Sequence, residues 1–317
     1  MSQEKRKPTI ELPDTFMGVN TKKALEKILA ETSAPDKPQA HVSQPGLHSL
    51  KPVYQGLGED YGLVFREAGR NIPFYITRDG RSRRETSISV NKILCDPTTS
   101  RLYFTQSPNA LMATDGEKVE EIRKYGVKNG KEAEPWGIWR EGDDVLVCLL
   151  EQGKIADHEG KVLHDNLEEP LAAITFNGRL YHAENWGRCL VDTAKNESVA
   201  KCGKWAEGLD ISIDGKRLYF GGFDKKVYSY DGQSQRQVAD LPFSIWSIHA
   251  VNEQGREVLY VGGYESRGIT RLELDNDEVT DKSVLLEGKI ENVASIAAVP
   301  LDFLEKLDRN FGVGEWE

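Results

Sequence analysis

Short stretches in which apolar and polar residues alternate recur along most of the chain. The clearest unit covers residues 207–241 and holds several such stretches, separated by turns with glycine and aspartate. Alternation with a period of two residues is typical of β-strands with one buried face. Glycine at the turns tolerates the positive φ angles that tight hairpins require. The unit therefore predicts a small antiparallel sheet.

The same unit recurs at residues 92–122, 136–163, 172–200 and 246–286. An isoleucine marks the first strand of each unit and occurs once more near the C-terminus, which gives Ile93, Ile138, Ile174, Ile211, Ile248 and Ile296. Their spacing of about 36–48 residues is that of four-stranded propeller blades. The repeat predicts an all-β fold, a six-bladed β-propeller.

The last marker, Ile296, has no further strands of its own unit behind it. Unassigned strand patterns occur instead before the first unit, at residues 61–65, 74–80 and 86–90. We therefore expect the strand of Ile296 to pair in a blade with Phe65, Tyr75 and Ile88. Closure by strands from both ends of the chain removes the exposed edges of an open array.

The two ends of the sequence differ from the repeat. Residues 1–52 contain several prolines and little alternation, with one amphipathic stretch near 21–31, which predicts an N-terminal arm with a short helix. The propeller is expected over residues 53–300, and the tail at 301–317 is expected to pack against it. A helix this short is marginal alone in water, so it must dock, either on its own propeller or on a partner.

Composition and charge narrow the class of partner. The net charge is −10, which argues against nucleic acid, because binding of phosphates needs clustered Lys and Arg. No stretch approaches the ~18 consecutive apolar residues of a membrane span, and no secretory signal is evident. The cysteines are expected as buried thiols: Cys95, Cys148, Cys189 and Cys202. These features predict a cytoplasmic protein.

Acidic residues precede four of the predicted first strands. They are Glu134, Glu169, Glu207 and Glu291. Because rotation relates the blades, these side chains would converge at the propeller axis, and clustered carboxylates repel unless a cation intervenes. Oxygen ligands suit a hard ion such as Ca²⁺. One hypothesis is a divalent-cation site; the alternative is that these side chains point into solvent.

Other residues near the expected channel are candidates for ligand binding. They are Trp136, Trp246, Asp210, His249 and Asn292. The two tryptophans occupy matching places and would either stack on a ligand or fill the core between blades. The histidine would serve either as an acid or base near the channel or as a hydrogen-bonded interior residue.

The strand pattern also carries a family resemblance. Residues 207–220 resemble the blade motif of gluconolactonase/regucalcin-like, strictosidine-synthase-like and NHL-type propellers, and residues 178–181 with 187–188 are similar. The resemblance covers much of residues 87–299. It implies a six-bladed fold and, for the hydrolases of this group, a divalent cation on the axis.

The sequence departs from those hydrolases at two places that the resemblance assigns to metal ligands. They typically carry Asn-Gly where Glu207 and Gly208 stand here, and Asp soon after the next strand, where Gly221 and Gly222 stand. The implied ligand set is therefore incomplete.

Three functions remain open. A binding or scaffolding propeller would present its channel face and N-terminal arm to a protein or small-molecule partner, and it needs no catalytic motif. A divalent-cation-dependent hydrolase or lactonase-like enzyme is the first alternative, favoured by the acidic residues and the resemblance. A small-molecule sensor that uses the two tryptophans is the second.

Overall fold

The protein is described from a computed structural model. The structure describes residues 15–16, 19–20, 61–68, 73–76, 83–86, 90–96, 98–127, 130, 133–185, 187–203 and 205–316. The chain divides into two compact units, Met1–Pro45 and Gly46–Glu317. Within the first unit, β1 (Thr15–Phe16) pairs with β2 (Val19–Asn20). The helix expected near 21–31 lies outside the described residues.

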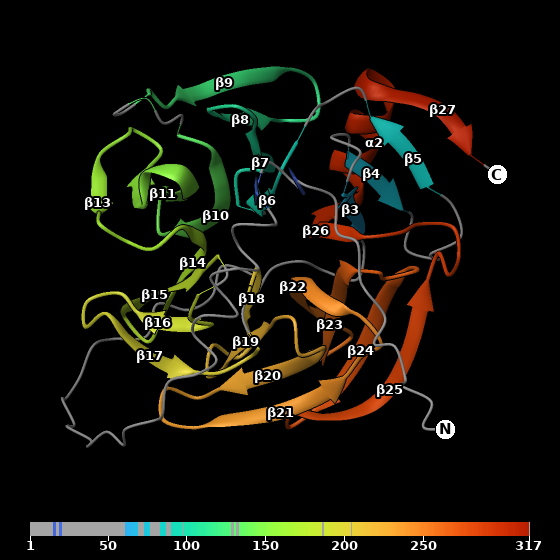
Figure 1. Ribbon diagram of the computed structural model, residues 1–317. Coiled ribbons are helices and arrows are strands. Elements are labelled where there is room, and N and C mark those ends of the chain that lie inside the picture. Colours follow the sequence, from blue (N-terminus) through green and yellow to red (C-terminus); the bar gives the residue numbers. More distant parts are fainter. Residues whose placement is uncertain are drawn as a thin grey trace, which may run out of the picture. The chain divides into compact units, whose positions relative to one another are not determined.

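The second unit is a β-propeller, whose sheets surround a common centre (Figure 1). Five of its sheets have four antiparallel strands in chain order. They are β6 (Ile93–Asp96), β7 (Arg101–Gln106), β8 (Ala110–Thr114) and β9 (Val119–Lys124); β10 (Pro135–Glu141), β11 (Asp144–Leu149), β12 (Lys154–Asp157) and β13 (Val162–His164); β14 (Pro170–Phe176), β15 (Arg179–Glu184), β16 (Leu190–Asp192) and β17 (Glu197–Ala200); β18 (Gly208–Ile211), β19 (Leu218–Gly221), β20 (Lys226–Tyr230) and β21 (Gln235–Asp240); and β22 (Ser244–Glu253), β23 (Arg256–Tyr264), β24 (Ile269–Asp275) and β25 (Glu278–Leu285). These sheets coincide with the five complete repeat units of the sequence.

A further sheet combines strands from both ends of the second unit. Its five strands follow the order β26 (Val293–Pro300), β3 (Tyr61–Glu67), β4 (Pro73–Ile76), β5 (Arg83–Thr86) and β27 (Gly312–Trp316). In the antiparallel pair of β26 and β3, Ile296 lies opposite Phe65.

The prediction of six four-stranded blades is wrong as stated, because the described residues form five four-stranded sheets and one of five strands. The extra strand is β27, which pairs with the outer edge of β5. The strand expected at 86–90 begins earlier, at Arg83, and Ile88 lies outside the part of the chain that the structure describes.

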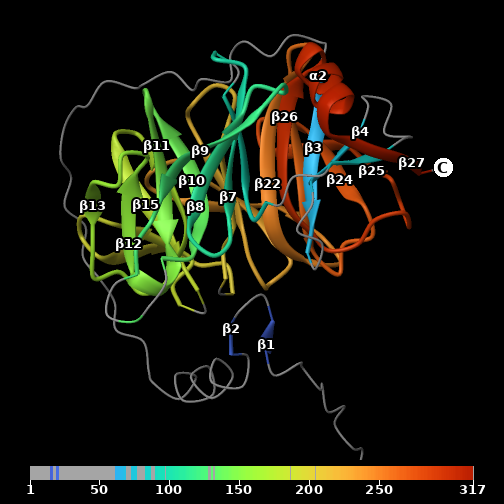
Figure 2. The same cartoon turned by 90° about the horizontal axis from the view of Figure 1, so that it is seen from above.

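The C-terminal segment covers one side of the five-stranded sheet. Helix α2 (Leu301–Phe311) buries Phe303, Leu304 and Leu307, which the helical spacing of three and four residues places on one face. This face packs into the apolar cluster around Val64 and Ile93. Figure 2 shows α2 beside β3 and β26. The expected packing of the tail thus takes the form of a helix followed by a strand.

Apolar side chains fill the spaces between neighbouring sheets. Alternation along β3 places Phe65 in a cluster with residues of β22 and β23, and Val64 in a cluster with residues of β6 and β7. The inner part of the five-stranded sheet is therefore packed on both faces.

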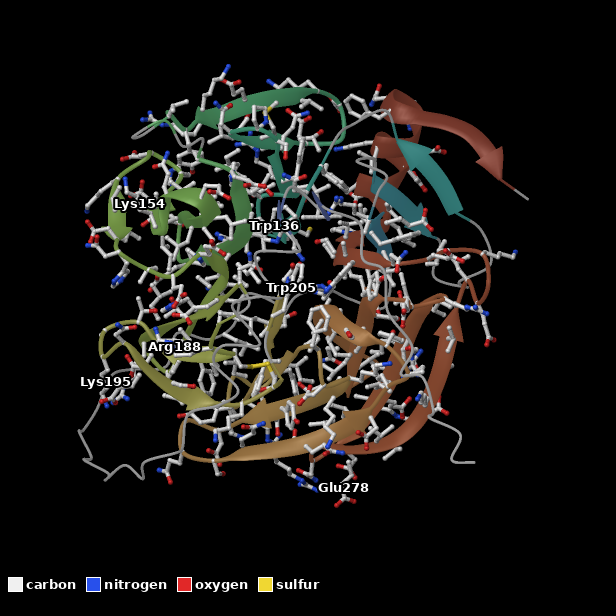
Figure 3. The ribbon with its side chains drawn as sticks, viewed as in Figure 1. Trp136, Lys154, Arg188, Lys195, Trp205 and Glu278 are labelled. Atoms are coloured by element: carbon white, nitrogen blue, oxygen red, sulfur yellow. A yellow bond between two sulfur atoms is a disulfide. The ribbon has the colours of Figure 1, made fainter. Side chains whose placement is uncertain are left out.

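One cysteine expectation is wrong. Cys189 and Cys202 form a disulfide with their Cα atoms 5.6 Å apart, seen as a yellow bond in Figure 3. They flank β16 and β17, where Leu190 lies opposite Ala200, so the antiparallel pairing brings the two thiols together. Cys95 and Cys148 are buried and free, as expected. Among the described residues, no helix has the length and apolar character needed to cross a membrane.

Candidate ligand-binding site

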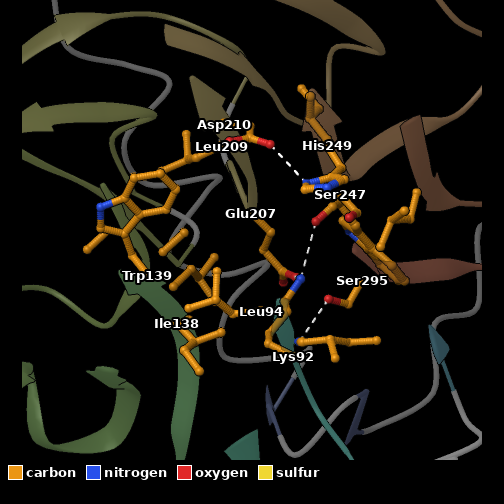
Figure 4. A pocket seen from close by; sticks show the side chains of 18 residues that line it. Lys92, Leu94, Ile138, Trp139, Glu207, Leu209, Asp210, Ser247, His249 and Ser295 are labelled. Atoms are coloured by element: carbon orange, nitrogen blue, oxygen red, sulfur yellow. Dashed lines mark hydrogen bonds and ion pairs between the residues drawn. The ribbon is translucent and has the colours of Figure 1, made fainter. Parts of the chain in front are cut away.

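A small cavity lies where the innermost strands of the propeller meet. Its volume is about 70 Å³, and its walls come from β6, β10, β14, β18, β22 and β26 (Figures 1 and 4). A water needs roughly 10–15 Å³ by this kind of measure, so the cavity holds a few water-sized groups. It is much smaller than the roughly 300–1,000 Å³ of sites for drug-sized ligands.

Lys92, directly before β6, extends its ammonium group into the middle of this site. Nζ lies 2.7 Å from Oε2 of Glu207 and donates hydrogen bonds to the carbonyl oxygens of Ala294, at 2.6 Å, and Trp246, at 3.2 Å. Three acceptors match the three N–H groups of an ammonium. Burial lowers the pKa of Lys92, and the Glu207 carboxylate opposes that shift. The side chain of Lys92 thus ties together strands from four sheets.

The two carbonyl acceptors of Lys92 come from β-bulges. In β22, Ile245 and Ser247 lie opposite Gly263 and Gly262, so Trp246 is an extra residue. In β26, the register shift between Val293 and Ser295 makes Ala294 an extra residue in the same way. An extra residue in a bulge is left out of the ladder. Its carbonyl is then available to the lysine, which explains why these two oxygens face a side chain.

Glu207, directly before β18, is compensated on both carboxylate oxygens. Oε2 pairs with Lys92, and Oε1 accepts a hydrogen bond from Nε1 of Trp205. Arg66 of β3 adds a second positive charge nearby: burial lowers the pKa of its guanidinium to about 10, and Glu207 acts in the opposite direction. Figure 4 shows Glu207 beside Lys92.

A second polar pair joins β18 and β22. Oδ2 of Asp210 lies 3.0 Å from Nδ1 of His249, and both side chains are buried (Figure 4). Oδ2 also accepts a hydrogen bond from the backbone N–H of Ala250, and Oδ1 accepts one from Ile211, both at 2.8 Å. An ionised carboxylate only accepts hydrogen bonds, so Nδ1 is the nitrogen of His249 that carries a proton.

The structure brings together some of the residues predicted from sequence. Asp210, His249 and Trp246 line the cavity, and the indole of Trp246 packs against Trp205, with ring centroids 6.1 Å apart. Trp136 is buried near the centre (Figure 3), and its carbonyl accepts a hydrogen bond from Thr105.

Asn292 has a different place. It has a left-handed backbone with φ of +55°, and its side chain accepts the N–H of Glu265 at 2.7 Å. Its contacts shape a loop, and it does not line the cavity.

The predicted acidic ring is not assembled at the cavity. Of its four glutamates, only Glu207 lines the wall. Glu169 is exposed and accepts a hydrogen bond from Asn185, and Glu291 is exposed and donates its backbone N–H to Glu67. Glu134 is half-buried, with φ of +42°, directly before β10. Within the described part of the chain, no three His, Cys, Asp or Glu side chains are grouped so that they could hold a metal ion. Binding of Ca²⁺ stays a prediction.

The marker isoleucines are not all equivalent. Those at 93, 138, 248 and 296 line the cavity, but the isoleucines of β14 and β18 do not; these strands line it with earlier residues, which include Ala172 and Leu209. Ile174 and Ile211 lie two residues further along their strands, opposite Tyr181 and Leu218. Both pack in the apolar cluster between their two sheets and do not reach the cavity.

Sequence reasoning missed three polar residues of the site: Lys92, Ser247 and Ser295. A lysine inside the apolar stretch that surrounds Ile93 was a readable signal, because a buried lysine needs a partner. The serines gave no such signal. No protein-family model matches the chain, and no curated protein is significantly similar to it in sequence.

Proposed function

We propose that the protein is a binding propeller whose ligand site is the axial cavity. The observation that carries the proposal is the convergence of two buried polar pairs, Lys92 with Glu207 and Asp210 with His249, on a cavity walled by the innermost strands. Ligand sites typically combine apolar walls with a few placed polar groups. A small molecule is thus the partner proposed for the channel, and an interaction of the N-terminal arm with a protein stays a prediction.

Binding at the cavity is tested by titrating small molecules while recording ¹H–¹⁵N spectra of the full chain. The indole N–H signals of Trp139 and Trp246, which line the cavity, should shift. Ala172→Leu, which adds volume to the cavity wall, should abolish the shifts, while Ala239→Leu on the outer strand β21 should leave them unchanged. Shifts that persist in Ala172→Leu would place the binding elsewhere.

A hydrolase is the second candidate, and the pair of Asp210 and His249 favours it. The carboxylate orients the imidazole and holds the proton at Nδ1. In a neutral imidazole, Nε2 can then accept a proton from a water molecule, which is the arrangement used in general-base catalysis. Hydrolysis of small lactones and esters, measured with and without Ca²⁺, tests this candidate. Activity that is unchanged in His249→Gln would exclude a role for the pair.

We propose further that the five-stranded sheet serves as a sixth blade and closes the ring. Support comes from the pairing of β26 with β3 and from the apolar clusters on both faces of that sheet. Tyr61 of β3 also donates a hydrogen bond to Glu253 of β22, in the neighbouring sheet. A closed ring would hold β6 and β22 at fixed positions around the cavity.

A further inference from the structure

We infer that the axial cavity takes a small neutral molecule with hydroxyl groups, and neither a metal ion nor a charged metabolite. This inference rests on the proposed binding function and names the chemical class of the ligand. It follows from how the charges that line the cavity are already compensated.

Within the first pair, each charge already has its partner, and Arg66, the second cation near Glu207, does not line the cavity. The ammonium of Lys92 has one acceptor for each of its N–H groups, and one of these acceptors is the carboxylate of Glu207. Glu207 has the indole of Trp205 on its other oxygen. The chain's own ammonium group therefore occupies the place beside Glu207 that a bound cation would need.

The second pair is compensated by the backbone. Asp210 receives two backbone N–H groups and Nδ1 of His249. A carboxylate with several hydrogen-bond donors is stable in its ionised form without a cation. A charged ligand would lose its hydration on entering the cavity and find no uncompensated opposite charge, which makes its burial costly.

The remaining wall suits a neutral amphiphilic molecule. Ser247 and Ser295 contribute hydroxyl groups, and the Oγ of Ser295 accepts the N–H of Ile93 at 3.1 Å, so its own O–H is left to donate. Ile248 and Ile296 supply apolar surface beside them. Together with the small volume, this wall fits a short polyol of a few non-hydrogen atoms.

The wild-type protein tests the class of ligand directly. Glycerol, acetate, methylammonium and Ca²⁺ are titrated separately, and the Trp139 and Trp246 indole signals report binding at the cavity. We expect glycerol to bind at least about tenfold more tightly than any of the ions. A tenfold ratio of Kd values corresponds to a difference of about 1.4 kcal/mol in binding free energy. Equal or tighter binding of an ion at these signals overturns the inference and leaves the proposed binding function standing. If neither these four probes nor any other small molecule shifts the two indole signals, the proposed binding function fails as well.

A charge-altering variant gives a second, independent readout. Glu207→Gln keeps the shape of the side chain but leaves Lys92 without its carboxylate, so the cavity should gain affinity for acetate by about tenfold or more. Glu291→Gln, at an exposed glutamate outside the cavity, is the matched control and should bind acetate as the wild type does. Acetate affinity that is the same in both variants would contradict the inference that compensated charge selects the ligand.

Discussion

The most consequential single residue is Lys92, because its partners come from three other sheets. It is buried, and removing one member of a buried ion pair leaves an uncompensated charge, which typically costs about 3–5 kcal/mol. Lys92→Met should therefore lower the free energy of unfolding by about that amount in urea denaturation. The double variant Lys92→Met/Glu207→Gln should be more stable than Lys92→Met alone, because the buried carboxylate that has lost its ion-pair partner is gone.

An exposed ion pair supplies the control. Lys216 lies 3.1 Å from Asp214 with most of its side chain in solvent. Exposed pairs contribute about 0–1 kcal/mol, so Lys216→Met should change the free energy of unfolding little. If Lys92→Met costs no more than Lys216→Met, the axial pair contributes nothing to stability.

Glu184 should make stability depend on pH in the acidic range. Burial alone would raise its pKa, but His182, whose Nε2 lies 3.6 Å from Oε1, and the hydrogen bonds from Arg188 outweigh burial and hold the pKa at about 2, against an ordinary value of 4.5. A depressed pKa in the folded state means that the carboxylate stabilises the protein fully above about pH 4.5 and that this contribution is lost as pH falls toward 2.

Urea denaturation at several pH values between 7 and 2 measures this contribution. Glu184→Gln should be less stable than the wild type at pH 7, and the difference should shrink steadily below pH 4.5. A constant difference across this range would contradict the assignment of the low pKa to Glu184.

Of the residues at the site, the sequence predicts those whose positions repeat from blade to blade. Asp210, His249, Trp246 and Glu207 stand at or near marker positions, and rotation of the blades brings them to one centre. Lys92 could not be interpreted in the same way, because two of its three acceptors are carbonyl groups exposed by bulges. Bulges are set by strand register, which a single sequence does not reveal.

Among the elements, β5 was misplaced and β27 was missed, and neither carries strong apolar alternation. In β5, Arg83 and Arg84 precede the stretch at 86–90 whose alternation was taken for the strand. Weakly patterned strands specify their register poorly, because neither face requires burial. The five residues of β27 were missed for the same reason: they follow a helix and hold only two apolar side chains, Val313 and Trp316.

The hairpin of β16 and β17 carries the disulfide, which closes a loop with a sequence separation of 13 residues. A disulfide that closes a loop of this length stabilises the folded state by about 3 kcal/mol, because it lowers the entropy of the unfolded chain. Cys202→Ser should therefore lower the free energy of unfolding by about 2–3 kcal/mol. Wild-type protein with a reducing agent should match the variant, since both lack the cross-link.

Counting thiols checks the same element without a variant. Unreduced, denatured protein should expose the two free thiols of Cys95 and Cys148, and reduction should raise the count to all four cysteines. A count of four without reduction would contradict the disulfide. A disulfide in the isolated protein would also weigh against the expected cytoplasmic location, because such bonds persist mainly in oxidising compartments.

For the whole molecule, the cavity and the proposed closure of the ring depend on each other. The wall of the cavity includes Ser295 and Ile296 of β26, and one acceptor of Lys92 is the carbonyl of Ala294. β26 reaches this position by pairing with β3, far earlier in the chain. Ligand binding should therefore respond to changes in the pairing of the chain ends, and a stable ring is the condition for a formed site.

Removal of C-terminal segments tests this dependence. A variant that ends before Val293 loses β26, α2 and β27, which exposes the inner edge of β3 and opens the clusters around Phe65 and Val64. Because apolar clusters join the neighbouring sheets, we expect this variant to lack a cooperative urea transition in near-ultraviolet circular dichroism. A variant that ends at Phe311 loses only β27 from the outer edge of β5, so it should unfold cooperatively, with a modestly lower midpoint. Cooperative unfolding of the first variant near the wild-type midpoint would show that the other sheets are stable without β26, and the closed ring would then have to be abandoned.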